Sequence, residues 1–263
     1  MAYLLPLSFQ ELRGISSFDR AESVLKGFMP RLFSASVSPQ LLYENYLTTY
    51  VEKDVNQLIN LKNTERFVLL LRLLAARVGQ LVNYDSLATE IGVSAATIRD
   101  WITVMEASFI VFRLYPYFKN YGKRFVKTPK IYFTDVGLAA HLLDLQTAKE
   151  VERDPLFGQL FENMVVANIR KNQFNAGHVR MGTAGMYFLR DKTGNEVDVA
   201  LEVSGRQLDL IEIKAGMTYN ADFAKSIVKY AEVIGSDYRH GEVIYAGIRA
   251  GYHNIDFLPF SET

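Results

Sequence analysis

The chain has 263 residues, 49% of them hydrophobic and 22% charged, and its 29 basic residues balance its 29 acidic ones. These values are ordinary for a folded protein of one large or two modest domains, and the net charge predicts no partner. The absence of cysteine excludes disulfides, thiolate metal sites and cysteine nucleophiles. No apolar run of about 18 residues and no signal-peptide pattern occurs, so we expect a cytoplasmic protein without a membrane partner.

The first part of the chain has mainly helical patterns. Ser8 begins a short helical segment, and residues 14–38 are irregular, with a short helix near 20–28. Pro39 suits the first turn of a long helix over 39–61, because its missing N–H group costs little there. A second helix is expected over 64–78, with apolar residues recurring at helical spacing.

The clearest supersecondary pattern of this part is a helix-turn-helix. A short helix over Tyr84–Ile91 is followed by a turn at Gly92 and a second helix capped by Ser94. Two strand-like runs come next, Phe109–Leu114 and Lys130–Thr134, with a turn-rich stretch between them. Helices followed by a β-hairpin predict a winged helix, which is a common DNA-binding fold.

After a polar stretch at 146–155, which we interpret as a linker, the pattern changes to alternating helices and strands. The predicted elements are a helix over 156–171, strands over 186–190, 196–203 and 207–214, a helix over 221–233, and strands over 242–246 and 255–258. The sequence therefore predicts two domains: a helical winged-helix domain and an α/β domain with a mixed central sheet.

Polar residues interrupt two strongly apolar strands of the second domain. Glu212 and Lys214 are two residues apart and should share one face of their strand, while Ile211 and Ile213 point into the core. Asp198 lies on the preceding strand, and we expect it to face away from that core too. A hairpin with a turn at Ser204-Gly205 would bring these three side chains together.

Two carboxylates and a lysine suit metal-dependent phosphodiester hydrolysis. Asp198 and Glu212 could hold Mg²⁺ or Mn²⁺, and Lys214 could orient the attacking water or offset developing charge. Glu162, on the predicted helix over 156–171, could supply a third metal ligand. The alternative is a cross-strand salt bridge on a solvated face, in which Lys214 pairs with either carboxylate and no metal binds.

Several motifs occur in one order along nearly the whole chain. They are Leu5–Phe9, Tyr50–Val55, Ala75–Gln80, Lys127–Leu138, Phe161–Asn163, Glu196–Asp198 and Ile211–Gly216. Together they resemble the C-terminal part of a prokaryotic family of AAA-type ATPases. In that family an ATPase core is followed by a winged helix and by a C-terminal domain of unknown function with a restriction-endonuclease-like fold.

The resemblance implies a restriction-endonuclease-like site at Glu162, Asp198, Glu212 and Lys214, although Val197 stands where a proline often precedes the aspartate. It also implies three segments. Residues 1–38 would be a remnant of the region that follows the ATPase core, residues 39–150 the helical winged-helix domain, and residues 151–263 the nuclease-like domain. The phosphate-binding loop of the ATPase core does not occur in this chain, since Gly122-Lys123 lacks the rest of the motif. We therefore expect no bound nucleotide and no ATPase activity.

Nucleic-acid contacts are expected mainly at the proposed wing. Between Ala107 and Thr134 there are six basic residues and no acidic one, interleaved with aromatic residues. Such a stretch favours phosphate contacts and base stacking, and the alternative is a solvated loop with packed aromatics. The residues predicted to bind nucleic acid are Arg99, on the recognition helix, and Lys119, Lys123, Arg124, Lys127 and Lys130.

Two functions follow from these expectations. The first is a divalent-metal-dependent nuclease module that the winged helix guides to DNA, with RNA as a further substrate to consider. The second is a non-catalytic module of an ATPase system, which binds DNA or a partner protein or forms a homo-oligomer. The weak recognition helix, in which only Arg99 suits base readout, favours the second.

Overall fold

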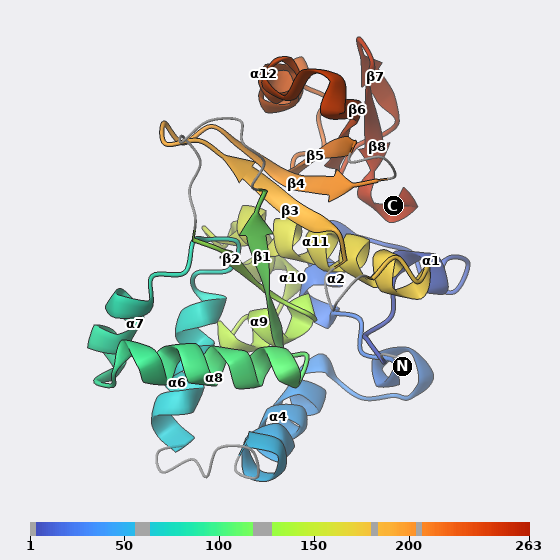
Figure 1. Cartoon of the computed structure of the whole chain (residues 1–263). Coiled ribbons are helices and arrows are strands. Elements are labelled where there is room, and N and C mark those ends of the chain that lie inside the picture. The colour runs from blue at the N-terminus through green and yellow to red at the C-terminus, as the bar shows by residue number, and fades with distance from the viewer. Residues whose placement is uncertain (1–3, 56–63, 118–127, 180–183, 204–206) are drawn as a thin grey trace. The chain divides into compact units, whose positions relative to one another are not determined.

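The computed structural model describes residues 4–55, 64–117, 128–179, 184–203 and 207–263 (Figure 1). The chain forms two compact units, each described by itself below. Unit 1 comprises Met1–Leu7, Ser17–Arg113 and Lys130–Ala167, and unit 2 comprises Ser8–Ser16, Leu114–Pro129 and Asn168–Thr263. None of the helices in the described stretches is long and apolar enough to cross a membrane.

Unit 1 is mainly helical. Its elements are α2 (Arg20–Lys26), α3 (Arg31–Ser34), α4 (Pro39–Thr49), the π-helix η1 (Tyr50–Val55), α6 (Thr64–Ala75), α7 (Tyr84–Ile91), α8 (Ala95–Ala107), the start of β1 (Val111–Pro116), β2 (Lys130–Phe133), α9 (Val136–Leu142), α10 (Ala148–Arg153) and the first part of α11 (Phe157–Asn175). The predicted helical character of the first half is confirmed.

The predicted short helix, turn and second helix are present as α7 and α8. The turn residue Gly92 has a left-handed backbone with φ +75°, which glycine adopts without steric cost. Ser94 caps α8, because its Oγ accepts a hydrogen bond from the Thr97 amide at 3.0 Å. Ile98 and Ile102 are buried on the inner face of α8. After α8 the chain enters β1, which neighbours β2 in the sheet.

Two expectations about this part are corrected. The helix predicted over 39–61 begins at Pro39 as expected, but it is α-helical only in α4 and continues as the π-helix η1; residues 56–63 lie outside the described part of the chain. The stretch 146–155 is not a linker, because it contains α10, whose N-terminus Thr147 caps. Only Val151 of this helix is buried, and four of its other five side chains are charged. Because this short helix has a single core residue, its sequence is as polar as that of a loop and shows no helical pattern of apolar residues.

Asp135 joins three segments of unit 1. Its carboxylate caps α9 by accepting from the Gly137 amide at 2.9 Å, and it also accepts from the Phe28 amide at 2.8 Å and the Tyr43 hydroxyl at 2.7 Å. Gly27, with φ +68°, lies so close that an added Cβ would be 2.0 Å from the Tyr43 hydroxyl. A Cβ on Gly137 would be 2.4 Å from the same oxygen, so neither glycine leaves room for a side chain.

Unit 2 contains most of the sheet. Its elements are α1 (Phe9–Leu12), the end of β1, the last part of α11, β3 (Met186–Arg190), β4 (Glu196–Glu202), β5 (Leu208–Lys214), η3 (Ala221–Ala224), α12 (Lys225–Ile234), η4 (Gly235–Asp237), β6 (Tyr238–Tyr245), β7 (Ala250–Tyr252), β8 (Ile255–Pro259) and η5 (Phe260–Glu262). The predicted order of helix, three strands, helix and strand is confirmed, and β7 is an additional strand.

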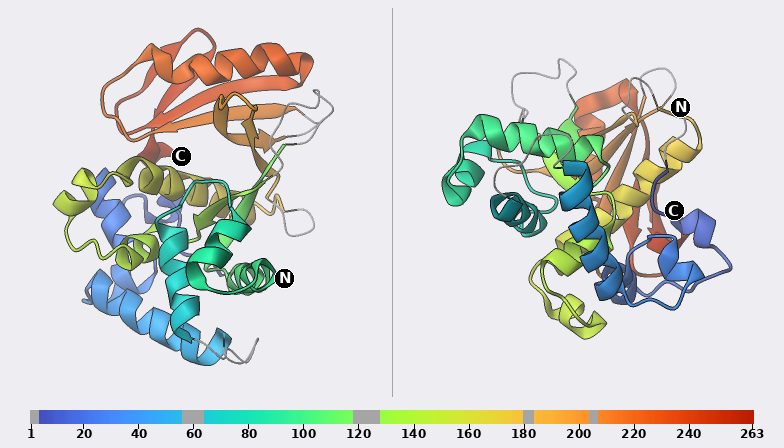
Figure 2. Two further views of the ribbon diagram at one scale, coloured as in Figure 1. Left: turned by 90° about the vertical axis from the view of Figure 1, so that its left-hand side faces the viewer. Right: turned by 90° about the horizontal axis from the view of Figure 1, so that it is seen from below.

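In the described parts of the chain, eight strands form one mixed sheet in the order β2-β1-β3-β4-β5-β6-β8-β7. β3, β4 and β5 are antiparallel neighbours, β6 and β8 run parallel to β5, and β7 is antiparallel to β8. The helix α12 connects β5 to β6 and packs across β4, β5 and β6 (Figure 2). β5 pairs with β4 on one side and β6 on the other, and its residues on both faces are buried from Leu208 to Ile213.

Candidate functional site

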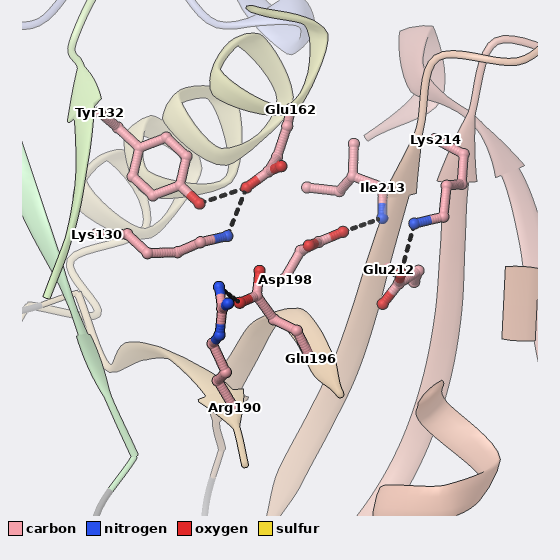
Figure 3. A network of polar contacts seen from close by, with 9 residues as sticks. All are labelled: Lys130, Tyr132, Glu162, Arg190, Glu196, Asp198, Glu212, Ile213 and Lys214. Atoms are coloured by element: carbon pink, nitrogen blue, oxygen red, sulfur yellow. Dashed lines mark hydrogen bonds and ion pairs between the residues drawn. The ribbon is translucent and has the colours of Figure 1, made fainter. Parts of the chain in front are cut away.

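Glu212 and Lys214 form an ion pair near the end of β5 (Figure 3). Lys214 Nζ donates to Glu212 Oε1 at 2.6 Å. The Glu212 side chain is 7% exposed, whereas that of Lys214 is 37% exposed. The structure therefore brings this predicted pair together, with the carboxylate in the interior and the ammonium near the surface.

Glu212 and Lys214 point away from Ile211 and Ile213, as alternation predicts, but their face of β5 is covered as well. Leu208 and Leu210 lie on the same face as Glu212, and both belong to the apolar cluster packed against α12. Ile211 and Ile213, on the opposite face, are also buried. Strict alternation of polar and apolar faces applies to sheets with one solvated face, and β5 has none.

Asp198 is buried on β4, with 6% of its surface exposed, and its Oδ2 accepts a hydrogen bond from the Ile213 amide at 2.8 Å (Figure 3). Its strand is irregular at this position. Tyr187 and Leu189 are two residues apart on β3. Their partners on β4, Ala200 and Val197, are three residues apart, so β4 has one extra residue here. This β-bulge lies in the pairing of β4 with β3. The pairing of β4 with β5 is regular up to Val199 and Ile211, and Asp198 and Glu212 follow one step beyond that pair on their neighbouring strands.

Glu162 lies in unit 1 on α11, where two side chains of β2 hold its carboxylate (Figure 3). Lys130 Nζ donates to Glu162 Oε1 at 2.9 Å, and the Tyr132 hydroxyl donates to the same oxygen at 2.5 Å. Lys130 is only 2% exposed. The expectation that Lys130 contacts nucleic acid is therefore corrected, because its ammonium is buried in this ion pair.

The sequence held a signal for this second pair. Lys130 and Tyr132 are two residues apart on a strand, so they share one face, like Glu212 and Lys214. The basic residues that surround Lys130 in the sequence mask this arrangement. Apolar residues flank it, however, and all four residues of β2 are buried.

The other residues predicted to bind nucleic acid differ in what the structure says of them. Arg99 is exposed on α8, and its guanidinium lies 4.9 Å from the centre of the Tyr84 ring. Arg113, from the same basic stretch, is held in an ion pair by Glu106. Four predicted residues lie outside the described residues: Lys119, Lys123, Arg124 and Lys127.

The donors present suit a magnesium-like ion better than a closed metal cage. Within the described part of the chain, no group of three or more His, Asp or Glu side chains could hold a metal ion. Asp198 and Glu212 offer two hard oxygen donors on neighbouring strands. Mg²⁺ accepts such a set, because it commonly keeps several waters and binds one or two carboxylates together with substrate phosphates.

Comparisons with known proteins identify two domains. Residues 18–149, half of the chain, match the family Domain of unknown function (DUF8612). The chain belongs to the DUF8612 family. Residues 157–262 match a second family, Domain of unknown function (DUF4143), which confirms the predicted C-terminal domain of unknown function.

Two curated relatives of this DUF8612 chain are the uncharacterized proteins Mb2031c of Mycobacterium bovis and Rv2008c of Mycobacterium tuberculosis. Each is 28% identical over 205 residues, which cover 77% of this chain and 45% of the relative. The chain thus matches less than half of the length of these relatives.

Proposed function

We propose that the chain is a nucleic-acid-associated protein whose C-terminal domain hydrolyses phosphodiester bonds with the help of a divalent cation. The observation that carries this proposal is the burial of Asp198 and Glu212 on neighbouring strands, one step beyond the Val199–Ile211 pair, with Lys214 beside them. Burial of carboxylates is costly, and proteins tolerate that cost mostly where the groups are paired or bind a cation.

The order and direction of the strands support a restriction-endonuclease-like fold for this domain. α11 is followed by three antiparallel strands, the connecting helix α12 and a strand parallel to β5. In the same way, α7 and α8 followed by the neighbouring strands β1 and β2 support a winged helix. DNA is the expected substrate and RNA is the alternative.

Each residue of the proposed site has a role that fits its surroundings. Asp198 and Glu212 would hold Mg²⁺ or Mn²⁺, and the Ile213 amide fixes the orientation of the Asp198 carboxylate. When bound, such an ion stabilises charge on the phosphate and lowers the pKa of a bound water. Lys214 reaches solvent, so its ammonium can leave Glu212 and bind a phosphate oxygen. Glu162 has its own partners in unit 1, and we leave it out of the proposed metal ligands.

Metal titration with a matched control tests the proposal. We expect Mg²⁺ or Mn²⁺ binding by calorimetry in the unmodified chain, and at least tenfold weaker binding in Asp198→Asn. Asp256→Asn changes a largely exposed carboxylate in the same unit and should bind as the unmodified chain does. Cleavage of labelled single-stranded, duplex and branched DNA should require the metal and Asp198. No metal binding and no cleavage in the unmodified chain would overturn the proposal.

A second candidate is a non-catalytic module that binds DNA or a partner protein. The observation that favours it is the 2.6 Å Lys214–Glu212 pair, which already neutralises the carboxylate. This candidate predicts that Glu212→Gln leaves DNA affinity and its salt dependence unchanged and that no cleavage is found. Sedimentation of the chain at several concentrations would show whether it forms a homo-oligomer.

A further inference from the structure

Two loops of unit 2 expose large apolar side chains. The loop after β5 carries Met217 and Tyr219, which are 61% and 41% exposed, and the loop after β6 carries Ile248, which is 82% exposed. Single exposed apolar residues are common, but three in adjoining loops form a patch that needs an explanation.

Backbone contacts show that the two loops adjoin. The Ala246 amide donates to the Gly216 carbonyl at 3.1 Å. A Cβ on Gly247 would lie 2.4 Å from the Met217 carbonyl oxygen, so glycine allows the backbones to touch. The Tyr219 ring rests against Phe257, with 4.8 Å between ring centres. Tyr219 is therefore supported from below while part of its surface stays exposed.

The patch lies next to the proposed catalytic residues. β5 and β6 are parallel, and Lys214 pairs with Tyr245 at their carboxyl ends, where both loops begin. Ligands of sheets with parallel strands commonly bind outside these ends. Met217 follows Lys214 by three positions, so a nucleic acid bound at Lys214 has these loops within the reach of one or two nucleotides.

We propose that the loops after β5 and β6 bind unpaired nucleotides, so that the substrate of the chain is single-stranded nucleic acid. This inference rests on the proposed function and names its substrate class. Bases of a single strand can stack on Tyr219 and on the apolar side chains of Met217 and Ile248, whereas duplex bases are already stacked on one another. Lys214 and Arg249 supply cations for the phosphates. The Arg249 side chain is 68% exposed and forms an ion pair with Glu262.

The size of the patch favours nucleotides over a protein. Stable protein interfaces bury about 800 Å² on each partner. Three side chains provide much less than this area but suffice for one or two bases. A second copy of the chain or another protein is thus a poorer fit than a short single strand.

Fluorescence anisotropy with labelled 20-nucleotide single strands of DNA and of RNA, and with the matching DNA duplex, tests the inference. Measurement of the full chain in EDTA separates binding from cleavage. We expect tighter binding of a single strand than of the duplex, and about tenfold weaker single-strand binding by the double variant Tyr219→Ala, Ile248→Ser. The DNA and RNA arms show which strand is preferred. The matched control, Val228→Ser with Val233→Ser, changes similarly exposed residues of α12 and should bind normally.

Equal affinity for single strand and duplex, or unchanged binding by the loop variant, overturns the inference. A loop variant that binds normally but loses self-association shows a protein interface instead, which also overturns it. Asp198→Asn distinguishes the two proposals, since it should abolish cleavage without weakening binding in EDTA. Loop-dependent single-strand binding without any cleavage would leave this inference standing and remove the nuclease function. Thermal melting of each variant confirms that it is folded.

Discussion

The two units each contain a lysine–glutamate pair, and the two pairs are buried in opposite ways. In unit 1 the Lys130 side chain is 2% exposed and its partner Glu162 is 16% exposed. In unit 2 the Glu212 carboxylate is buried and the Lys214 ammonium is more than one-third exposed. The same two residue types therefore give an interior cation, Lys130, in unit 1 and an interior anion, Glu212, in unit 2.

The difference decides which partner can move. A buried ammonium has no water to replace a lost carboxylate, so Lys130 keeps Glu162 in place. Lys214 has access to water, so it can exchange Glu212 for another anion at little cost. The pair in unit 1 therefore has the character of a structural contact, while the pair in unit 2 can serve a ligand. The same substitution of glutamate by glutamine in each unit tests this comparison.

The largest effect is expected from Glu162→Gln. The change leaves the interior Lys130 ammonium opposite a neutral amide, and the unfolding free energy should fall by about 3 kcal/mol. Denaturant unfolding followed by the fluorescence of Trp101, the single tryptophan and a buried residue of unit 1, measures it. Glu65→Gln, at an exposed position of α6, is the control. A loss below about 1 kcal/mol would show that Lys130 does not depend on Glu162.

A smaller effect is expected from Glu212→Gln. The amide oxygen can still accept from Lys214, and water can solvate the released ammonium, so the loss should stay below about 1 kcal/mol. Denaturant unfolding followed by circular dichroism measures it, with the exposed Glu232→Gln of α12 as control. If the loss equals that of Glu162→Gln, the two pairs are equivalent and the comparison fails.

The smallest effect, of opposite sign, is expected from Glu242→Gln on β6. Burial raises the pKa of Glu242 above its ordinary value of 4.5, and the nearby carboxylates of Asp209 and Asp256 raise it further. The positive charges of His240 and Arg239 lower the pKa, but by less. A carboxyl group with a raised pKa in the folded chain stabilises it below pH 4.5, and this contribution is lost as the pH rises through the folded-state pKa.

Glu242→Gln should therefore stabilise the chain at pH 7, by less than about 1 kcal/mol. The advantage should disappear as the pH falls below 4.5, the ordinary pKa of this group. Unfolding at a series of pH values measures it. A loss of stability at pH 7 would mean that the ionised Glu242 makes a favourable contact that burial does not reveal.

Local signals predicted much of the fold. Ser8 and Glu11 form a capping box at α1, and the left-handed Gly92 with the Ser94 cap defines the turn between α7 and α8. These features depend on residues within a few positions of one another, so the sequence displays them directly. The order of strands and helices in the second domain was likewise predictable from apolar runs and turns.

Features that depend on distant residues could not be predicted. The bulge around Asp198 arises where β4 pairs with β3, and the alternation of residues in β4 alone gives no sign of it. The burial of Lys130 requires a carboxylate 32 positions away on α11. The meeting of Glu212 and Lys214 could be predicted from their spacing on one strand. The burial of their face could not, because it depends on α12 packing over β5.

The crowding around Asp135 has a consequence for the history of the sequence. Gly27 and Gly137 approach the same Tyr43 hydroxyl, and a Cβ at either would be within 2.5 Å of it. Neither position can therefore drift independently of position 43 without a clash. A Cβ on Gly27 would also lie 2.2 Å from Asp135 Oδ1, so related chains should conserve the three residues together. Positions 27, 43 and 137 should accordingly behave as one inherited character when DUF8612 sequences are compared.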